Sequence, residues 1–177
     1  MSALGLRRFQ TLLQNLGREL TMGGSVLYGT KRKVIAVSDT RTLTTAESGA
    51  TVLWTKGTAH NITLPAAAVG LNYKIVIKVS SDNLHKIAAA SGDCFFGQVT
   101  VLDNADDKLS TQTITYATAT GTVASYDHLK LDGNANDTGS GAGSVIELEC
   151  VDSTAWRVTA RLLTSGTPTS IVTIYAG

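Results

Sequence analysis

Residues 61–79, NITLPAAAVGLNYKIVIKV, hold two alternating segments joined by a bend of small residues. In the first segment, Ile62 and Leu64 alternate with polar residues up to Pro65, which has no backbone N–H and therefore stops a strand's hydrogen-bond ladder. In the second segment, large apolar side chains recur at every second position, at Tyr73, Ile75, Ile77 and Val79. Since successive side chains of a strand point to opposite faces, the stretch predicts two strands that each bury one face.

The same period of two continues on both sides of this stretch, from about residue 34 onward. Threonine, valine and isoleucine crowd the alternating segments, while glycine, asparagine, aspartate and serine crowd the gaps. No alternation of strands and helices indicates a nucleotide-binding α/β sheet. We therefore expect a mainly β chain with an antiparallel β-sandwich or barrel-like body. The expected strands are residues 33–37, 41–44, 51–54, 61–64, 72–79, 86–89, 98–102, 112–116, 128–131, 144–151, 155–163 and 170–175.

Residues 147–163, ELECVDSTAWRVTARLL, form the second strong unit and predict a hairpin with its turn at residues 152–154. On the returning strand Trp156 shares one face with Val158 and Ala160, and we expect its ring to anchor the core. The two cysteines, Cys94 and Cys150, belong to no CxxC pair, so we expect two small buried apolar side chains.

Residues 2–20 show the chain's only good helical period. Their apolar residues step by three and four positions and make one stripe of about two heptads, too short to be stable alone. The stripe can pack on its own body or trimer, on a larger surface, or at a lipid surface. It consists of Leu6, Phe9, Leu13, Leu16 and Leu20, with Arg7, Arg8 and Arg18 beside it. A glycine-bearing linker, residues 23–33, then ends in Lys31, Arg32 and Lys33, a triplet able to grip phosphates or carboxylates.

The chain therefore divides into an N-terminal helix and basic linker arm, residues 1–33, and a β-rich body, residues 34–177. Residues 1–41 carry seven basic and two acidic residues, a net charge of +5, whereas the remainder carries eight basic and twelve acidic residues, a net charge of −4. The whole chain has a formal net charge of only +1, which gives no reason to expect a nucleic-acid partner. A basic arm on a mildly acidic body favours an acidic partner for the arm.

Three groups of residues carry side chains that could form a reactive or metal-binding site. Residues 132–137, DGNAND, match the first ligand spacing of an EF-hand, but Asp137 stands where the turn glycine belongs and Gly143 where the final carboxylate belongs. We expect a surface loop there, with a weak calcium site of another kind left open. Asp103, Asp106 and Asp107 could do acid–base work on sugars, although turn residues of this kind are usually only turn residues.

The three histidines, His60, His85 and His128, lie in or beside separate expected strands. In a trimer, one histidine from each chain could meet at a three-fold axis and bind a metal ion. We expect instead lone histidines at the surface or at strand edges. No run of about 18 apolar residues predicts a transmembrane helix, and polar residues interrupt the apolar start of the chain, so we expect no secretion signal.

Two units carry a family resemblance. The first combines residues 47–49 (ESG), 64–68 (LPAAA) and 70–73 (GLNY), and the second combines residues 143–148 (GSVIEL) and 155–158 (AWRV). With them the chain resembles the small β-rich virion proteins of tailed bacteriophages, namely head-decoration (cement) proteins and related modules of head and tail fibres. The resemblance covers about residues 45–177 and rests on structural motifs rather than on a catalytic signature.

The resemblance implies a virion structural protein without enzymatic activity or cofactor. It implies a homotrimer on the capsid surface, assembled in the host cytoplasm, with the major capsid protein as partner and neither nucleic acid nor membrane involved. An N-terminal arm often makes the lattice contact in such proteins, so the helix at residues 2–20 and the basic triplet are the expected binding residues. The alternative is a tail- or head-fibre or spike adaptor protein that contributes to host attachment.

Overall fold

The computed structural model of the chain describes residues 32–81, 85–103, 107–114, 127–131 and 140–164, together with the backbone of residues 20–22, 25–27 and 172–175. These residues form fourteen strands and one short 3-10 helix, η1 (Thr45–Glu47). The strands are β1 (Leu20–Met22), β2 (Ser25–Leu27), β3 (Val34–Val37), β4 (Arg41–Thr42), β5 (Thr51–Trp54), β6 (Asn61–Thr63), β7 (Asn72–Ile77), β8 (His85–Ala88), β9 (Cys94–Asp103), β10 (Lys108–Ile114), β11 (His128–Leu131), β12 (Val145–Cys150), β13 (Ala155–Thr164) and β14 (Val172–Tyr175).

Strands dominate the described chain, so the expectation of a mainly β protein is confirmed. Each of the twelve strands expected in the body is present, although β9 starts four residues early, at Cys94, and β10 starts at Lys108. The arm was predicted less well. Leu20, placed in the helical stripe, lies in β1, and residues 25–27 of the expected linker form β2, which pairs antiparallel with β1. The rest of the expected helix, residues 2–19, lies outside the described residues.

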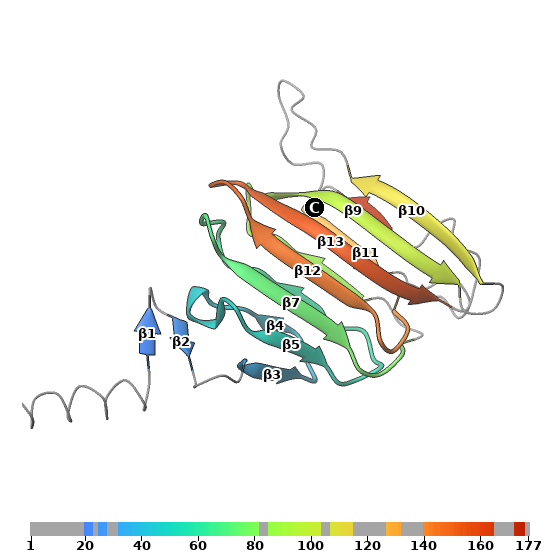
Figure 1. Ribbon diagram of the computed structural model, residues 1–177, viewed down its shortest axis with the longest axis horizontal. Coiled ribbons are helices and arrows are strands. Elements are labelled where there is room, and N and C mark those ends of the chain that lie inside the picture. The colour runs from blue at the N-terminus through green and yellow to red at the C-terminus, as the bar shows by residue number, and fades with distance from the viewer. Residues whose placement is uncertain are drawn as a thin grey trace, which may run out of the picture.

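The strands of the body are divided between two large sheets. A seven-stranded sheet has the order β10-β9-β13-β12-β7-β5-β3, and a five-stranded sheet has the order β14-β11-β8-β6-β4. Figure 1 shows the seven-stranded sheet in front, with β4 and β11 behind it. One continuous cluster of buried side chains contains residues from both sheets, so the two sheets bury their inner faces against each other.

The first half of the body is a coil of parallel strands. From β3 to β8 the chain alternates between the sheets, so that β3, β5 and β7 pair in parallel in one sheet and β4, β6 and β8 pair in parallel in the other. The expectation of an antiparallel body is wrong for this half. Each crossing takes the chain to the opposite sheet, and the next crossing returns it to the first sheet. Successive strands of one sheet therefore run in the same direction, whereas a hairpin would reverse them. The link through Pro65 and Gly70 is such a crossing, and Gly70 takes a left-handed φ of 90° there.

The second half of the body is mostly antiparallel. The expected hairpin is confirmed as β12 and β13, and it lies between β7 and β9 in the seven-stranded sheet. β13 runs parallel to β9 along ten paired residues. At Gly97, which has a φ of 140°, an added Cβ would lie 2.0 Å from the carbonyl oxygen of Val158. Only glycine allows the backbones of β9 and β13 to approach so closely at this point.

Inward side chains form continuous rows across the seven-stranded sheet. One row joins Ile35, Val52, Ile75, Ile146, Ala160 and Val99, each of which lies opposite the next in the strand register. All six are buried, and burial of a side chain such as isoleucine contributes roughly 1.5–3 kcal/mol to folding. Trp156 is fully buried and packs beside Tyr73, as a core anchor should. Val79, expected on the inner face, lies beyond the end of β7 and is exposed.

Candidate partner-binding face

Charged and polar side chains gather on the outer face of the seven-stranded sheet. One outward row runs through Lys74 on β7, Glu147 on β12 and Thr159 on β13, each opposite the next in the register. The neighbouring row places Glu149 on β12 opposite Arg157 on β13. These positions are outward because their strand neighbours, such as Leu148 and Val158, are buried.

Two ion pairs hold the charged side chains in place. The Lys74 ammonium lies 3.2 Å from a carboxylate oxygen of Glu147, and the Arg157 guanidinium donates to the carboxylate of Glu149. Both pairs join residues directly opposite each other on neighbouring antiparallel strands, where side chains interact most strongly. At the surface such a pair contributes only about 0–1 kcal/mol to stability, so the pairs serve more to position charge than to hold the fold.

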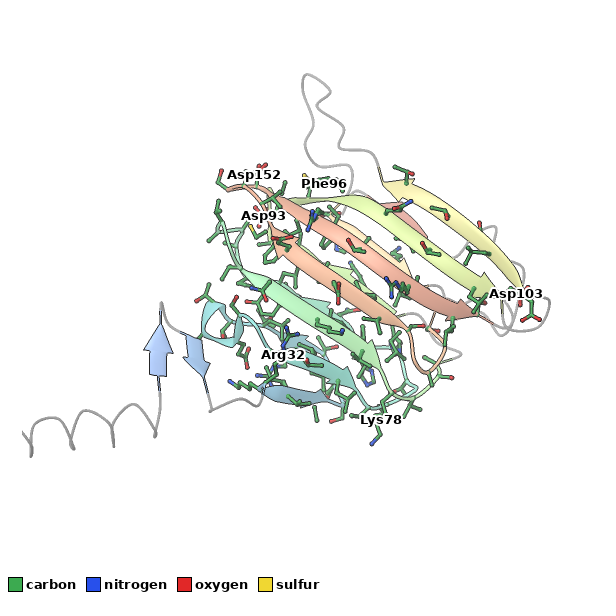
Figure 2. The ribbon with its side chains drawn as sticks, in the orientation of Figure 1. Arg32, Lys78, Asp93, Phe96, Asp103 and Asp152 are labelled. Carbon is green, nitrogen blue, oxygen red and sulfur yellow. The ribbon has the colours of Figure 1, made fainter. Side chains whose placement is uncertain are left out.

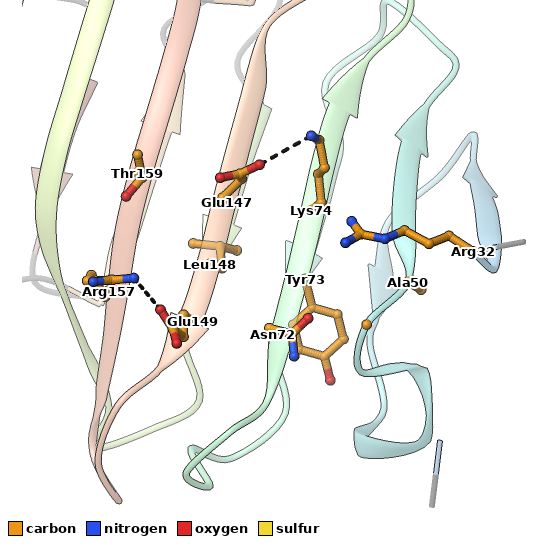
Figure 3. Close-up of a pocket in the computed structure, with 11 residues that line it drawn as sticks. Arg32, Ala50, Asn72, Tyr73, Lys74, Glu147, Leu148, Glu149, Arg157 and Thr159 are labelled. Atoms are coloured by element: carbon orange, nitrogen blue, oxygen red, sulfur yellow. Dashed lines mark hydrogen bonds and ion pairs between the residues drawn. The ribbon is translucent and has the colours of Figure 1, made fainter. Parts of the chain in front are cut away.

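The charged rows line two shallow depressions, of about 280 Å³ and 160 Å³, that share Lys74, Glu147 and Thr159. Together they form one trough across β7, β12 and β13. Arg32, which comes two residues before β3, lines the larger depression, and in Figure 3 its side chain extends over the sheet toward β7. Arg161 of β13 lines the smaller one.

The trough carries more positive than negative charge. Four cationic side chains line it, those of Arg32, Lys74, Arg157 and Arg161, against the carboxylates of Glu147 and Glu149. Lys74 and Arg157 are paired with these glutamates, while Arg32 and Arg161 have no ion-pair partner among the described residues. The trough therefore has two uncompensated guanidinium groups, that of Arg32, which extends toward β7 (Figure 3), and that of Arg161 on β13. Guanidinium groups bind carboxylates through two parallel hydrogen bonds.

An aliphatic row borders the trough. Ala36, Leu53, Val76 and Val145 lie opposite one another on β3, β5, β7 and β12, and the next residue of this row is Arg161. These four side chains point outward and are exposed or half-buried. A charged trough beside an aliphatic row is a surface suited to binding another protein, because it offers apolar contact together with oriented charges.

Only part of the site expected from the sequence can be located. Arg32 lies in the trough, and Lys33 is exposed beside it, with its carbonyl oxygen accepting a hydrogen bond from the Thr51 amide. Leu20 is described only as part of β1. The other expected binding residues lie outside the described chain: Leu6, Arg7, Arg8, Phe9, Leu13, Leu16, Arg18 and Lys31.

Sequence reasoning missed the body's share of the trough. A signal for it was present, because Arg157 and Arg161 alternate with buried Val158 and Ala160, and Lys74 alternates with buried Tyr73 and Ile75. Alternation alone shows which residues face outward. It does not show which strands are neighbours, so the meeting of these side chains could not be predicted.

The histidines are arranged differently from expectation. His60 and His85, expected at the surface or at strand edges, are buried, with 4% and 0% of their surface exposed. The His85 ring stacks on Trp54 at 4.2 Å between centroids, and His60 meets it edge-on at 5.8 Å. Neither ring nitrogen of His85 has a hydrogen-bond partner, and burial, helped by the nearby His60, lowers the pKa of His85 to about 4. The stack joins the two sheets through their core.

The remaining candidates for chemistry are dispersed. His128 pairs with Asp127 through its Nδ1, apart from the buried pair. Asp103 is buried at the far end of β9, apart from Arg32 in Figure 2, and Asp107 is an exposed turn residue with a φ of 53°. Asp106 and residues 132–137 lie outside the described chain. Among the residues that are described, no three His, Cys, Asp or Glu side chains gather as a metal site would require.

The two cysteines are confirmed as buried and free. Burial raises the pKa of both thiols, and the nearby carboxylates of Asp93 and Asp152 add to this effect. A raised pKa keeps a thiol protonated and poorly nucleophilic. Cys94 and Cys150 therefore act as core side chains.

Comparisons with known proteins add no family assignment. No protein-family model matches the chain, and no curated protein matches it in sequence. None of the helices within the described residues is both long enough and apolar enough to cross a membrane.

Proposed function

We propose that the chain is a virion structural protein that decorates and stabilises the capsid shell of a tailed phage by non-covalent binding, as a homotrimer. The observation that carries the proposal is the continuity of the basic arm with the trough. Arg32, in the arm's basic triplet, lies on the same outer face as Arg157 and Arg161 of the body. Arg32 and the body therefore offer one basic surface to an acidic partner, which we take to be the major capsid protein.

The side chains of this surface are suited to binding another protein. They offer guanidinium, ammonium, hydroxyl and aliphatic contacts arranged along a rigid sheet. A protein that binds the assembled shell but not free subunits stabilises the assembled state by mass action. Many copies, each with a modest interface, add their contributions, and the three arms of a trimer raise the effective concentration for one another.

Substitutions in the full chain test whether the apolar stripe of the arm binds the shell. Replacing Phe9 and Leu13 by serine removes two residues of the apolar stripe, and we expect it to lower the occupancy of purified particles at least several-fold. The matched control replaces Gln10 and Gln14, which lie off the stripe, by serine and should coat particles as the unmodified chain does. Equal occupancy for both variants would show that the arm is not the anchor.

A second candidate is a fibre or spike adaptor that contributes to host attachment. The stacked parallel turns from β3 to β8 favour it, because such turns can be extended by stacking further repeats. Electron microscopy of particles labelled on this chain separates the two candidates. A label spread over the shell supports decoration, and a label confined to one vertex supports the adaptor.

A further inference from the structure

We propose that the trough on the outer face receives an extended acidic segment of the partner protein, with acidic groups toward its two ends and a neutral middle. This inference rests on the proposed function, since it names the chemistry that the shell would present. It goes further by assigning the ligand to a defined set of body residues and by stating how its charges are spaced.

The dimensions of the sheet set the length of the segment. The Arg32 side chain extends from the start of β3 toward β7 (Figure 3), and Arg161 lies on β13, so the strands β7-β12-β13 separate the two guanidinium groups. Two intervals of about 4.8 Å separate β7 from β13 by about 10 Å, and Arg161 lies two residues, or about 7 Å, along β13 from Thr159, which is in the row of Lys74. The resulting separation is about 12 Å. An extended chain advances about 3.3 Å per residue, so a segment of about five residues spans it and presents its first and last side chains on one face.

The distribution of charge sets the pattern of the segment. The uncompensated guanidinium of Arg32 extends toward β7 (Figure 3) and that of Arg161 belongs to β13, whereas Glu147 and Glu149 lie on β12 between these two strands. Acidic groups near the ends of a bound segment would each find an arginine. An acidic group in the middle would find only Lys74 and Arg157, whose charges Glu147 and Glu149 already neutralise, and would gain no cationic partner.

The same pattern disfavours two other ligand classes. A nucleic-acid strand carries one phosphate per nucleotide, so some of its charges would fall beside the glutamates. A sugar usually stacks on an exposed aromatic face. Among the described residues that line the trough the only aromatic one is Tyr73, which is buried and donates its hydroxyl hydrogen to the Thr44 carbonyl oxygen. The hydroxyl of Thr159 can hydrogen-bond a peptide, and the aliphatic row beside the trough can hold its neutral side chains.

Three peptides test the charge pattern against the isotopically labelled full chain, with amide shifts followed by NMR. The first, acetyl-EGSGE-amide, has glutamates at both ends. The second, acetyl-GEESG-amide, has the same composition and charge with the glutamates in the interior, and the third replaces both glutamates of the first by glutamine. We expect the first peptide to shift the amide signals of Arg32, Lys74 and Arg161. The other two peptides should bind at least about tenfold more weakly, which is the effect of losing one charge-assisted pair.

Charge reversal within the chain provides the second arm of the test. We expect Arg32→Glu with Arg161→Glu to weaken binding of the first peptide by about tenfold or more. The matched control, Lys56→Glu with Lys78→Glu, makes the same change in net charge at exposed lysines that do not line the trough, and Figure 2 shows Lys78 apart from Arg32. The control should bind within about twofold of the unmodified chain.

Several results would overturn the proposal. These are equal affinity for the first two peptides, shifts that map to another face, or equal weakening by the trough and control variants. Tighter binding of a six-nucleotide DNA would assign the trough to nucleic acid, and loss of self-association in the trough variant would assign it to a second copy of this chain. The occupancy of purified particles separates failure of this inference from failure of the proposed function. A trough variant that still coats particles refutes only the role of the trough, while absence of the unmodified chain from particles refutes the proposed function.

Discussion

The buried His85 should make the protein lose stability in mild acid. Burial beside Trp54 and the nearby His60 lower its pKa from an ordinary value of 6.5 to about 4. Between these two values the unfolded chain binds a proton that the folded chain does not. Stability is therefore complete above about pH 6.5 and falls as the pH drops toward 4.

The magnitude follows from the size of the shift. One pKa unit corresponds to 1.36 kcal/mol, so a shift of about 2.5 units is on the order of 3 kcal/mol at most. From pH 6.5 to pH 5 the expected loss is about 1–2 kcal/mol, because unfolding takes up between half a proton and nearly one proton there, and one proton corresponds to 1.36 kcal/mol per pH unit. Glu47 acts in a different pH range. Its lowered pKa stabilises the folded chain above the ordinary value of 4.5, and this contribution is lost as the pH falls below 4.5.

Urea denaturation at pH 7.5, 6.5, 5.5 and 5.0, at fixed protein concentration and salt, measures this loss. The variant His85→Phe keeps an aromatic ring against Trp54 and removes two unpartnered nitrogens, so it should unfold at higher urea and show a nearly flat pH profile over this range. A matched control, His128→Gln, alters a histidine outside the stack and should keep the full slope. The reasoning is refuted if His85→Phe loses stability between pH 6.5 and 5 as steeply as the unmodified chain.

Three further predictions concern packing and polar contacts, each read from urea denaturation at pH 7. Gly97→Ala would place a Cβ 2.0 Å from a backbone oxygen and should cost several kcal/mol, on the order of 3 or more, whereas Gly92→Ala, with open space around its Cβ, should cost only about 1–2; equal losses would contradict the close approach of β9 and β13. Trp156→Ala removes a fully buried indole ring that packs beside Tyr73 and should lower the free energy of unfolding by about 3–5 kcal/mol. A loss below about 1 kcal/mol would show that the ring is not a core anchor. Glu47→Ala leaves the Thr44 amide and the Arg41 guanidinium without their carboxylate and should cost about 1–3 kcal/mol. Burial raises the pKa of Glu47, but the Thr44 amide and the Arg41 charge outweigh it and hold that pKa below its ordinary value, so the variant and the unmodified chain should converge as the pH falls below about 4.5 and stay apart at pH 7.

The sequence was sufficient to predict the strands of the body, but it did not show how they are connected. Alternation at residues 61–79 predicted the buried sides of β6 and β7 because the period of two depends only on the strand itself. It did not show that Ile62 and Ile75 belong to different sheets, since a bend through Pro65 can either reverse a strand or carry it across the core. The parallel coil therefore could not be predicted, whereas the hairpin of residues 147–163 could, because its turn is local.

The candidate site shows the same division between local and non-local information. The basic triplet was visible as a run of charge, and Arg32 does lie in the trough. Arg161 and Lys74 could be recognised as outward residues, but their meeting depends on β12 and β13 lying next to β7. The buried histidines had a local signal that was not used: His60 is in phase with Ile62 and Leu64, and His85 is in phase with Ile87.

The number of copies of this chain per virus particle tests the central proposal most directly. Under the proposed function a phage encodes the chain, so particles of that phage would be purified and the amount of the chain measured against the major capsid protein by quantitative mass spectrometry. A decoration protein is predicted at hundreds of copies per particle in a fixed ratio to the capsid protein. A few copies per particle, or none, would contradict the account.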